Sequence, residues 1–485
     1  MKTGYENGLH NFSVAKKIDI VPQIFINFSM LKKTIFITSF HLLISRNIID
    51  TDITRLLVAQ QLRVVVIIPN YKKEYFERTF KGTGLLFEGV AVNEPSKTKL
   101  GLFFKRLARF MLPTKTVRLY EKYRMLTLKK SLWYRLFFWI CQALGYLTFI
   151  LPLIRFLDEK YSPHHFFNKL LDKYHPDLVV TTDILNENDV CLMQEAKNRK
   201  IPIVAVIRSW DNLTAHSIIR IIPDRLLVWS EILKREASFY GGMSKEKITV
   251  VGIPHFDRYT SDSMIPRDEF IKKIGADPRK KLVFFTPIGD LYLRHNDTDR
   301  YVLDLLSKMD VNILVRFPAW DKVSNMDGFQ PPPHMFFDKP GVIHRPNEIG
   351  DRDISRKDNE MLINGIYWSD LVITGPSTIA IEAAFFDKPI VLVNFHQTHK
   401  KGLDGIFSYQ CNHFKYILKS GGVRLVNTAD EFIEWTKRYL ENPALDQDGR
   451  QRIVEEQFGG LNDHHASVRI VNAIIDELSK HQNHA

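Results

Sequence analysis

The sequence predicts an α/β protein built from two doubly wound, Rossmann-like domains. Short apolar runs rich in Val and Ile alternate with amphipathic helical stretches, which is the pattern of βαβ units and parallel sheets. A length of 485 residues is too great for one hydrophobic core. A polar, Pro-containing stretch at about residues 252–270 separates two such series and is the expected interdomain connection.

The first series supplies a parallel sheet in the amino half. Two strands with an amphipathic helix between them make a right-handed βαβ unit at residues 34–69. This part of the chain has no G-x-G-x-x-G motif, which disfavours a dinucleotide fold of the dehydrogenase type. The expected strands of this sheet are 34–40, 64–69, 178–183, 203–207, 223–230 and 249–253.

The second series contains the most informative stretch of the chain, residues 371–395, LVITGPSTIAIEAAFFDKPIVLVNF. It predicts a buried strand, a break at Gly375 and Pro376, a helix over 378–386 with Ser377 as its N-cap, and a second buried strand. A helix that opens at the carboxyl end of a strand presents free backbone N–H groups and the positive end of its dipole, which suits a phosphate. The other expected strands of this half are 282–287, 312–317 and 341–345.

Glu382 lies four residues after Thr378 on the same face of that helix. We expect its carboxylate to accept hydrogen bonds from ribose hydroxyls while the helix N-terminus holds phosphates. The alternative is an ordinary β-α-β crossover in which Ser377 is only a cap and Glu382 is solvated.

The positive charge of the chain is concentrated in one segment. The net charge of +12 and the pI of about 9.3 point to an anionic partner. In residues 97–135 basic and apolar side chains recur three to four positions apart, which predicts an amphipathic basic helix of the kind that lies on anionic membranes. The acid of this segment is Glu121, and its basic residues are Lys97, Lys99, Lys105, Arg106, Arg109, Lys115, Arg118, Lys122, Arg124, Lys129, Lys130 and Arg135.

Residues 136–154 follow with nineteen uncharged positions, which is long enough to consider a membrane span. Gln142, Gly145 and Pro152 weaken that interpretation, and a single span would place two halves of one domain on opposite sides of a bilayer. The expectation is therefore a monotopic helix or hairpin in one leaflet, with a buried helix and a true span as alternatives. Together the two segments favour a membrane partner over nucleic acid.

The cysteines and the amino terminus indicate the compartment. Cys141, Cys191 and Cys411 are scattered without the spacing of a disulfide framework or a metal site. The first residues have no continuous apolar core behind a basic start and make a poor secretory signal. Both features favour reduced thiols in a cytoplasmic protein.

Two sets of motifs resemble known families. Residues 371–395 are similar to the nucleotide-sugar loop in the C-terminal domain of GT-B glycosyltransferases, and they also resemble the CDP-glycerol glycerophosphotransferases. The motifs RSWDN, PDRLLVWS and VVGIPHFDRY, within residues 208–259, resemble a bacterial family of capsule and surface-polysaccharide transferases in the same superfamily. The resemblance implies two domains that face a cleft, with the donor on the carboxyl domain and the acceptor on the amino domain.

The RSWDN loop follows a strand and lies where open α/β sheets bind ligands. In the setting that the resemblance implies, Asp211 is the candidate general base for the acceptor hydroxyl, and Asp183, at another strand end, is the second candidate. The alternative for Asp211 is a structural role in capping its own loop. The other expected cleft or acceptor residues are Arg46, Asn47, Trp210, Asn212 and His255. For Arg46 the alternative is a solvent-facing helix start, and for His255 it is a packed linker residue.

In GT-B transfer the leaving group is a nucleoside diphosphate, whose negative charge grows as the glycosidic bond breaks. The residues expected to bind the donor, and to neutralise this charge without metal, are Arg316, Arg345, Gly375, Ser377, Thr378 and Glu382. Similar transferases commonly have His-Pro after the basic residue near Arg316, whereas this chain has Phe-Pro. No Asp-x-Asp in a loop demands a divalent ion, so the expectation is no metal and no bound cofactor.

These observations predict an acceptor-side domain over residues 1–255 with a membrane-associating insertion at about 97–160, a donor domain over 256–460, and a last helix within 461–485 that crosses back to the first domain. The expected function is transfer of a sugar from a nucleotide-activated donor to a lipid-linked or polymer acceptor in cell-surface polysaccharide synthesis, at the cytoplasmic face of the membrane. The alternatives are polyol-phosphate transfer from a CDP-glycerol-type donor, a UDP-GlcNAc 2-epimerase-like activity, and a non-catalytic membrane scaffold.

Overall fold

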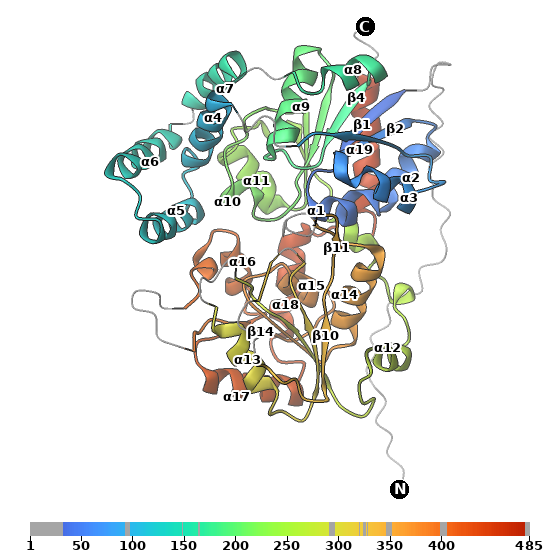
Figure 1. Ribbon diagram of the computed structural model, residues 1–485, viewed down its shortest axis with the longest axis vertical. Helices are drawn as coiled ribbons and strands as arrows, with labels where there is room; N and C mark the ends of the chain where they lie inside the picture. Colours follow the sequence, from blue (N-terminus) through green and yellow to red (C-terminus); the bar gives the residue numbers. More distant parts are fainter. Residues whose placement is uncertain are drawn as a thin grey trace. The chain divides into compact units, whose positions relative to one another are not determined.

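The computed structural model contains two parallel β-sheets flanked by helices, which confirms the predicted fold class (Figure 1). The sequence predicts no element for residues 1–30, and these lie outside the described part, as does Lys97. The structure describes residues 33–92, 98–147, 149–162, 165–290, 296–319, 321–323, 326, 328–345, 352–397 and 405–480.

The first sheet has seven parallel strands in the order β3-β2-β1-β4-β5-β6-β7. The interior strand β1, with the sequence TIFIT, is buried along its whole length, as a parallel strand covered on both faces should be. The order reverses between β1 and β4, and the crevice at the carboxyl ends of those two strands is the topological switch point, where open α/β sheets bind ligands. The strands are β1 Thr34–Thr38, β2 Arg63–Pro69, β3 Leu86–Val90, β4 Leu178–Thr181, β5 Ile203–Val206, β6 Arg225–Val228 and β7 Ile248–Val250.

The second sheet repeats this topology with six strands in the order β10-β9-β8-β13-β14-β15, and its switch point lies between β8 and β13. The expected strand over 341–345 is wrong for this sheet, because Val342–Ile343 pairs antiparallel with Arg352–Asp353 in a separate two-stranded ribbon of β11 and β12. The strands of the main sheet are β8 Leu282–Thr286, β9 Asn312–Arg316, β10 Met335–Asp338, β13 Leu371–Thr374, β14 Ile390–Val393 and β15 Arg424–Val426.

Local sequence sets where the helices begin and end. For example, Thr51 accepts a hydrogen bond from the N–H of Ile53 at the start of α2, and Ser355 and Asp358 form a capping box at the start of α14. The helices of the two sheets are α2 Asp52–Ala59, α3 Lys73–Thr79, α8 Asn168–Tyr174, α9 Glu187–Asn198, α11 Glu231–Phe239, α13 Thr298–Leu306, α14 Arg356–Trp368, α15 Ile379–Phe385, α16 Phe414–Lys419, α17 Ala429–Glu441 and α18 Gln447–Phe458.

The connection between the two sheets contains the 3-10 turns Pro254–Arg258 and Ser261–Ser263 and the helix α12 Arg267–Ile274. The last described helix, α19 Ala466–Lys480, packs against α2 of the first sheet (Figure 1). Arg225 at the start of β6 forms an ion pair with Glu477 of α19 at 3.2 Å.

Four helices inserted between β3 and β4 form a helical module beside the first sheet (Figure 1). They are α4 Lys99–Phe110, α5 Lys115–Thr127, α6 Leu132–Gly145 and α7 Ile150–Tyr161. The module has its own apolar core, which includes Phe104, Phe110, Met111, Val117 and Phe138. The predicted basic helix is therefore two helices, α4 and α5, and the uncharged segment 136–154 is not one helix.

Buried polar side chains hold this module together. Glu121 of α5 is fully buried and accepts hydrogen bonds from Arg109 of α4 at 2.9 Å and from the hydroxyl of Tyr134 of α6 at 2.8 Å. Gln142, inside the uncharged segment, donates to the carbonyls of Phe110 and Leu112 at 2.6 and 2.9 Å. These bonds satisfy carbonyls at the carboxyl end of α4, which is why a polar residue stands in an apolar run.

Candidate functional site

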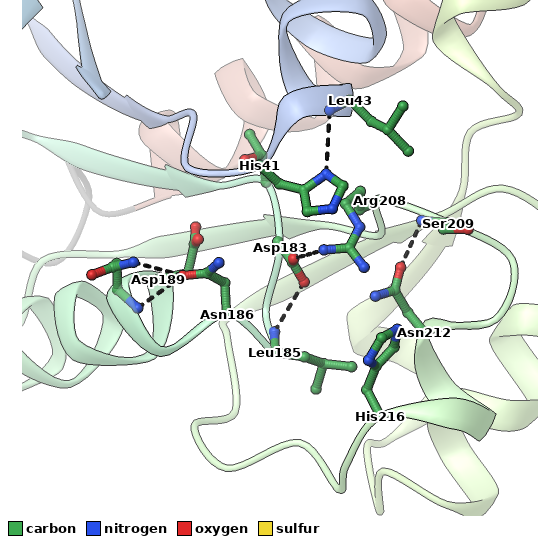
Figure 2. Close-up of polar contacts among 12 residues, drawn as sticks. His41, Leu43, Asp183, Leu185, Asn186, Asp189, Arg208, Ser209, Asn212 and His216 are labelled. Atoms are coloured by element: carbon green, nitrogen blue, oxygen red, sulfur yellow. Dashed lines mark hydrogen bonds and ion pairs between the residues drawn. The ribbon is translucent and has the colours of Figure 1, made fainter. Parts of the chain in front are cut away.

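A cavity of about 190 Å³ lies at the carboxyl edge of the first sheet, next to its switch point (Figure 2). Its walls come from α4, from the loop between β4 and α9, and from the loop after β5 with the short helix α10 Asn212–Ala215. Its lining residues, which define the pocket, are Lys105, Asp183, Leu185, Asn186, Glu187, Arg208, Asn212 and His216. Asp183 and Asn212 were expected near a site, whereas Lys105, Arg208 and His216 were not expected there.

Asp183 forms an ion pair with Arg208 in the pocket wall, and its carboxylate also accepts a hydrogen bond from the N–H of Leu185 at 3.3 Å (Figure 2). The Asp183 side chain is buried and the Arg208 side chain nearly so. Because its charge is neutralised within the chain, this carboxylate is poorly placed to take a proton from a substrate. In this structure the carboxylate anchors Arg208, and its expected role as second candidate base stays a prediction.

Two buried donors in the pocket have no hydrogen-bond partner among the described residues. Asn212 accepts a hydrogen bond from the N–H of Ser209 at 2.6 Å through Oδ1, which fixes the amide and leaves Nδ2 without an acceptor. Nε of Arg208 is likewise buried without a hydrogen-bond acceptor in the described part of the chain. An unsatisfied buried donor costs about 1–3 kcal/mol, so an acceptor oxygen that reached either atom after a shift of the loop would stabilise the pocket wall.

Asp211 and His216 form a pair on either side of α10. Nε2 of His216 lies 3.6 Å from Oδ2 of Asp211, and the two side chains are 41% and 28% exposed. Burial alone would raise the pKa of Asp211, but the hydrogen bond and charge of His216, with His413 and Arg208, lower it below its ordinary value. A carboxylate of lowered pKa is a weak general base. His216 lines the pocket and Asp211 does not, and the expected base role of Asp211 stays a prediction.

His41 lies near Arg208 at the amino end of the short helix α1 Leu42–Ile44 (Figure 2). Its Nδ1 accepts a hydrogen bond from the N–H of Leu43 at 3.2 Å. Burial, followed by the charges of Arg208, His216 and Lys72, holds the pKa of His41 well below its ordinary value. No spacing in the sequence pointed to this histidine.

Arg46, expected in the cleft, and Glu382, expected to meet the donor, are bonded to each other. Arg46, in the π-helical turn η1 Ser45–Ile49, forms a 2.8 Å ion pair with Glu382 of α15, and the hydroxyl of Tyr259 donates to the same carboxylate at 3.0 Å. The Arg46 and Glu382 side chains are 10% and 3% exposed. Burial would lower the pKa of Arg46, but the charge of Glu382 and these hydrogen bonds raise it. Both side chains are thus engaged within the chain, and the expected ribose contact of Glu382 stays a prediction.

A second buried cluster lies beside the first. Lys72, at the end of the turn after β2, forms a 3.0 Å ion pair with Asp353 of β12, and both side chains are buried. Asp353 also accepts a hydrogen bond from Ser45 Oγ at 3.1 Å, and Nε2 of His344 lies 2.8 Å from its carboxylate. We call these two clusters, Arg46–Tyr259–Glu382 and Lys72–Asp353–His344–Ser45, the buried joint, because each connects the first sheet's loops to the carboxyl half.

The expected diphosphate-binding arginines are also engaged within the chain. Arg316 forms an ion pair with Asp338 and donates to the carbonyl of Asp358 at 2.9 Å. Its side chain is 5% exposed, so its expected role as a free phosphate contact is wrong for this conformation. Arg345 stacks on the ring of Tyr71 at 4.2 Å from the centroid.

The expected phosphate loop lies at the switch point of the second sheet. Gly375 is required by packing, because a Cβ there would come within 2.3 Å of Cγ1 of Ile288 in the loop after β8. The helix begins one residue later than expected: Thr378 is the N-cap of α15, and Ser377 Oγ accepts a hydrogen bond from the N–H of Ile379 at 3.3 Å. Ser377 and Thr378 are partly exposed, so side chains do not bury this end of α15.

The remaining expected residues have packing roles. Asn47 donates to the carbonyl of Arg208 at 3.3 Å. Trp210 packs edge-on against His413 and Phe414, which places its ring away from the pocket. His255 is buried among aromatic rings, and burial with the charge of Arg46 lowers its pKa well below the ordinary value. Within the described residues no group of three or more His, Cys, Asp or Glu side chains is placed to hold a metal ion.

No protein-family model matches this sequence, and no curated protein matches it. Among solved structures, the fold is similar to UDP-GlcNAc 2-epimerase from Neisseria meningitidis bound to UDP-GlcNAc, with 12% identity, a TM-score of 0.50 and coverage of 92% of this chain and 100% of that chain. It is similar to a putative UDP-N-acetylglucosamine 2-epimerase from Listeria monocytogenes, with 11% identity, a TM-score of 0.51 and coverage of 92% and 96%. The glycosyltransferase of kitacinnamycin matches with 13% identity, a TM-score of 0.49 and coverage of 92% and 99%. The likeness to the two 2-epimerase structures supports a fold of two Rossmann-like α/β domains with parallel sheets.

Proposed function

We propose that this protein is a glycosyltransferase that moves a sugar from a nucleotide-activated donor to a hydroxyl-bearing acceptor held in the pocket. The observation that carries the proposal is the pocket itself: it is built wholly by the amino half, and it holds two buried donors without partners beside a His–Asp pair. An acceptor site separate from the donor site is what a transferase needs, whereas an epimerase acts on one bound nucleotide sugar.

The pocket suits a sugar ring or a polyol. Its cations and anions nearly balance, since Arg208 is paired with Asp183 and Lys105 lies 4.0 Å from Glu187. A volume of about 190 Å³ is below the roughly 300–1,000 Å³ of sites that enclose a whole drug-sized ligand, so it fits one unit of a larger acceptor. A lipid-linked or polymer acceptor in cell-surface polysaccharide synthesis has such a terminal unit.

The chemistry assigned to the pocket is proton removal during displacement at the anomeric carbon. The acceptor oxygen forms a bond to that carbon as the bond from the carbon to the diphosphate oxygen breaks. The acceptor proton passes to His216, and the charge of Asp211 stabilises the resulting imidazolium. Asn212 Nδ2 and Arg208 Nε hold acceptor oxygens in line, and the nucleoside diphosphate leaves from the carboxyl half, beside Ser377 and Thr378.

Two enzymatic alternatives differ in the nucleotide that they release. Polyol-phosphate transfer from a CDP-glycerol-type donor breaks the bond between the two phosphates and releases a nucleoside monophosphate. Epimerisation of the kind suggested by the 2-epimerase likeness inverts a donor carbon without any acceptor. Glycosyl transfer releases a nucleoside diphosphate and requires an acceptor, so product analysis separates the three.

The first experiment identifies the donor. Thermal unfolding is measured with UDP, GDP, CDP and dTDP, and a specific site raises the melting temperature for one base preferentially. The matching nucleotide sugars, and CDP-glycerol, are then incubated with the protein and a lipid-linked oligosaccharide, and the released nucleotide is identified by chromatography. Release of a monophosphate, or epimerised donor in the absence of acceptor, contradicts the proposal, and no turnover with any donor favours a scaffold.

The second experiment tests the pocket. The His216→Ala variant should lose transfer while its melting temperature and its nucleotide affinity stay near those of the wild type. The matched control is His465→Ala, which removes another partly exposed histidine beside an aspartate, Asp463, outside the pocket. Full transfer by His216→Ala excludes the assigned base.

A further inference from the structure

Helix α6 presents an apolar face outwards. Its exposed large apolar side chains fall within an arc of about 120°, at 100° per residue, and its buried side chains occupy the opposite arc. Trp133 is 80% exposed and Leu132 79% exposed. A surface helix of a globular protein normally turns its polar face to water. The exposed set is Leu132, Trp133, Leu136, Trp139 and Ile140.

Helix α7 repeats the arrangement after a bend. Phe149, Leu153 and Phe156 follow one another at four and three residues, so they share one face, and they are 75%, 55% and 57% exposed. Leu151 and Asp158 lie buried on the other face. Among the described residues no single helix is long and apolar enough to cross a membrane. Helices α6 and α7 are long and apolar enough only when taken together, and they are bent by 120° relative to each other.

The charge of the module has one sign at its surface. Residues 98–161 contain thirteen Lys and Arg and three acids. Glu121 is buried against Arg109, Asp158 is buried against Arg220 at 2.6 Å, and Glu159 lies 3.4 Å from Lys197. The exposed basic side chains of the four helices are Lys99, Lys105, Arg106, Lys115, Lys122, Arg124, Lys129, Arg135 and Lys160.

We propose that the helical module docks on an anionic lipid surface, with the apolar faces of α6 and α7 buried in the headgroup region of one leaflet and the basic side chains on the phosphates. Amphipathic helices of this kind insert by roughly 5–10 Å, and Trp side chains favour that depth. A second copy of this chain is a poor occupant, because it would bring a second unbalanced set of cations to the same face. The inference does not depend on catalysis, so its failure and that of the proposed function are separate results.

The first test is flotation of the full chain with vesicles of phosphatidylcholine alone or with added phosphatidylglycerol. We expect at least tenfold tighter binding to the anionic vesicles, weakened by salt. The Trp133→Ser/Phe149→Ser variant should lose at least tenfold in affinity, since each side chain loses its burial in lipid. The control is Leu86→Ser/Ile343→Ser, which removes two exposed apolar residues outside the module and should bind like the wild type.

The second test separates direct insertion from a general effect on folding. Lipids brominated near the headgroup should quench tryptophan fluorescence of the wild type, and Trp133→Phe/Trp139→Phe should bind normally but lose most of that quenching. Lys129→Glu/Arg135→Glu should weaken anionic-vesicle binding, by roughly fivefold or more for each charge removed, while Lys272→Glu/Lys273→Glu on α12 should not. No binding to either vesicle, equal binding by all variants, or a wild-type oligomer that Trp133→Ser/Phe149→Ser dissociates would overturn the proposal.

Discussion

The pocket and the buried joint contain the same kinds of charged residue but differ in their access to water. In the buried joint, Arg46 with Glu382 and Lys72 with Asp353 are paired and almost wholly removed from water. In the pocket, Arg208 is likewise paired with Asp183, but His216 is 41% exposed and an open cavity lies beside these residues. A buried donor without a partner among the described residues occurs in both regions, at Arg46 Nε and at Arg208 Nε. Paired buried charges fix the chain, so an open cavity with an exposed side chain, rather than an unsatisfied donor, distinguishes the candidate site from a structural ion pair.

The largest expected effect tests the pocket side of this comparison. His216→Ala should reduce the rate of transfer by roughly 10²–10⁴-fold, the usual contribution of a general base, with less than about 1 kcal/mol lost from the free energy of unfolding. Initial rates with the donor found by the nucleotide screen, together with urea denaturation, measure both quantities. If the variant unfolds instead, His216 has a structural role like that of the residues in the buried joint.

The next effect tests the other side. Glu382→Ala leaves Arg46 charged and buried without its partner, and we expect a loss of about 3–5 kcal/mol in the free energy of unfolding. The Arg46→Met/Glu382→Leu double variant removes both charges and should recover most of that stability. Urea denaturation of both variants is the measurement. A Glu382→Ala protein that stays stable but no longer binds the nucleotide-sugar donor would instead assign this carboxylate to the donor site.

A third case is a buried carboxylate with an unpartnered oxygen, Glu236 of α11. Burial raises its pKa to about 8 from an ordinary 4.5. The pKa of Glu236 is higher in the folded state than in the unfolded state. The contribution of this side chain to the free energy of unfolding is therefore fully present below pH 4.5 and is lost as the pH rises through about 8. Glu236→Gln should therefore gain on the order of 2–4 kcal/mol over the wild type between those limits. Urea denaturation at pH 5 and pH 8.5 measures it, with the exposed Glu456→Gln as the control.

The smallest effect concerns Nδ2 of Asn212, a hydrogen-bond donor without a partner among the described residues. Asn212→Ala should raise the KM for the acceptor substrate by about three- to tenfold through the loss of one hydrogen bond, while the KM for the nucleotide-sugar donor stays unchanged. It should also lose about 1 kcal/mol of stability, because the Ser209 N–H loses its acceptor. An equal change in both KM values would indicate a general distortion of the loop.

Periodicity was sufficient to predict the fold. Buried parallel strands such as β1, β2 and β8 are continuous apolar runs, and their spacing implies crossovers. The short edge strands β10 and β15 were not recognised, since each has a single buried residue, the first of β10 and the last of β15. The break between α6 and α7 agrees with the hairpin form that was one of the expectations for this segment, where Gly145 was already noted. Its exact position depends on packing, because a Cβ at Gly145 would lie 2.0 Å from the carbonyl of Met111.

The site was predictable only in part. Strand ends correctly directed attention to Asp183 and Asn212, because position along a strand is a local property. The partners of Glu382 and Arg316 are not local: Arg46 lies 336 residues from Glu382, and Asp338 reaches Arg316 through strand pairing. His216 and Lys105 enter the pocket from α10 and α4, whose positions depend on packing between helices that no sequence spacing specifies.

The wide turn η1 joins these regions through three consecutive side chains. Ser45 bonds Asp353, Arg46 bonds Glu382, and Asn47 bonds the backbone carbonyl of Arg208. Under the proposed function, donor binding in the carboxyl half that shifts either acid would displace the guanidinium of Arg208 in the pocket. The link between the two proposed substrates would then need only the five residues of this turn, and we expect a change in its length to weaken that link.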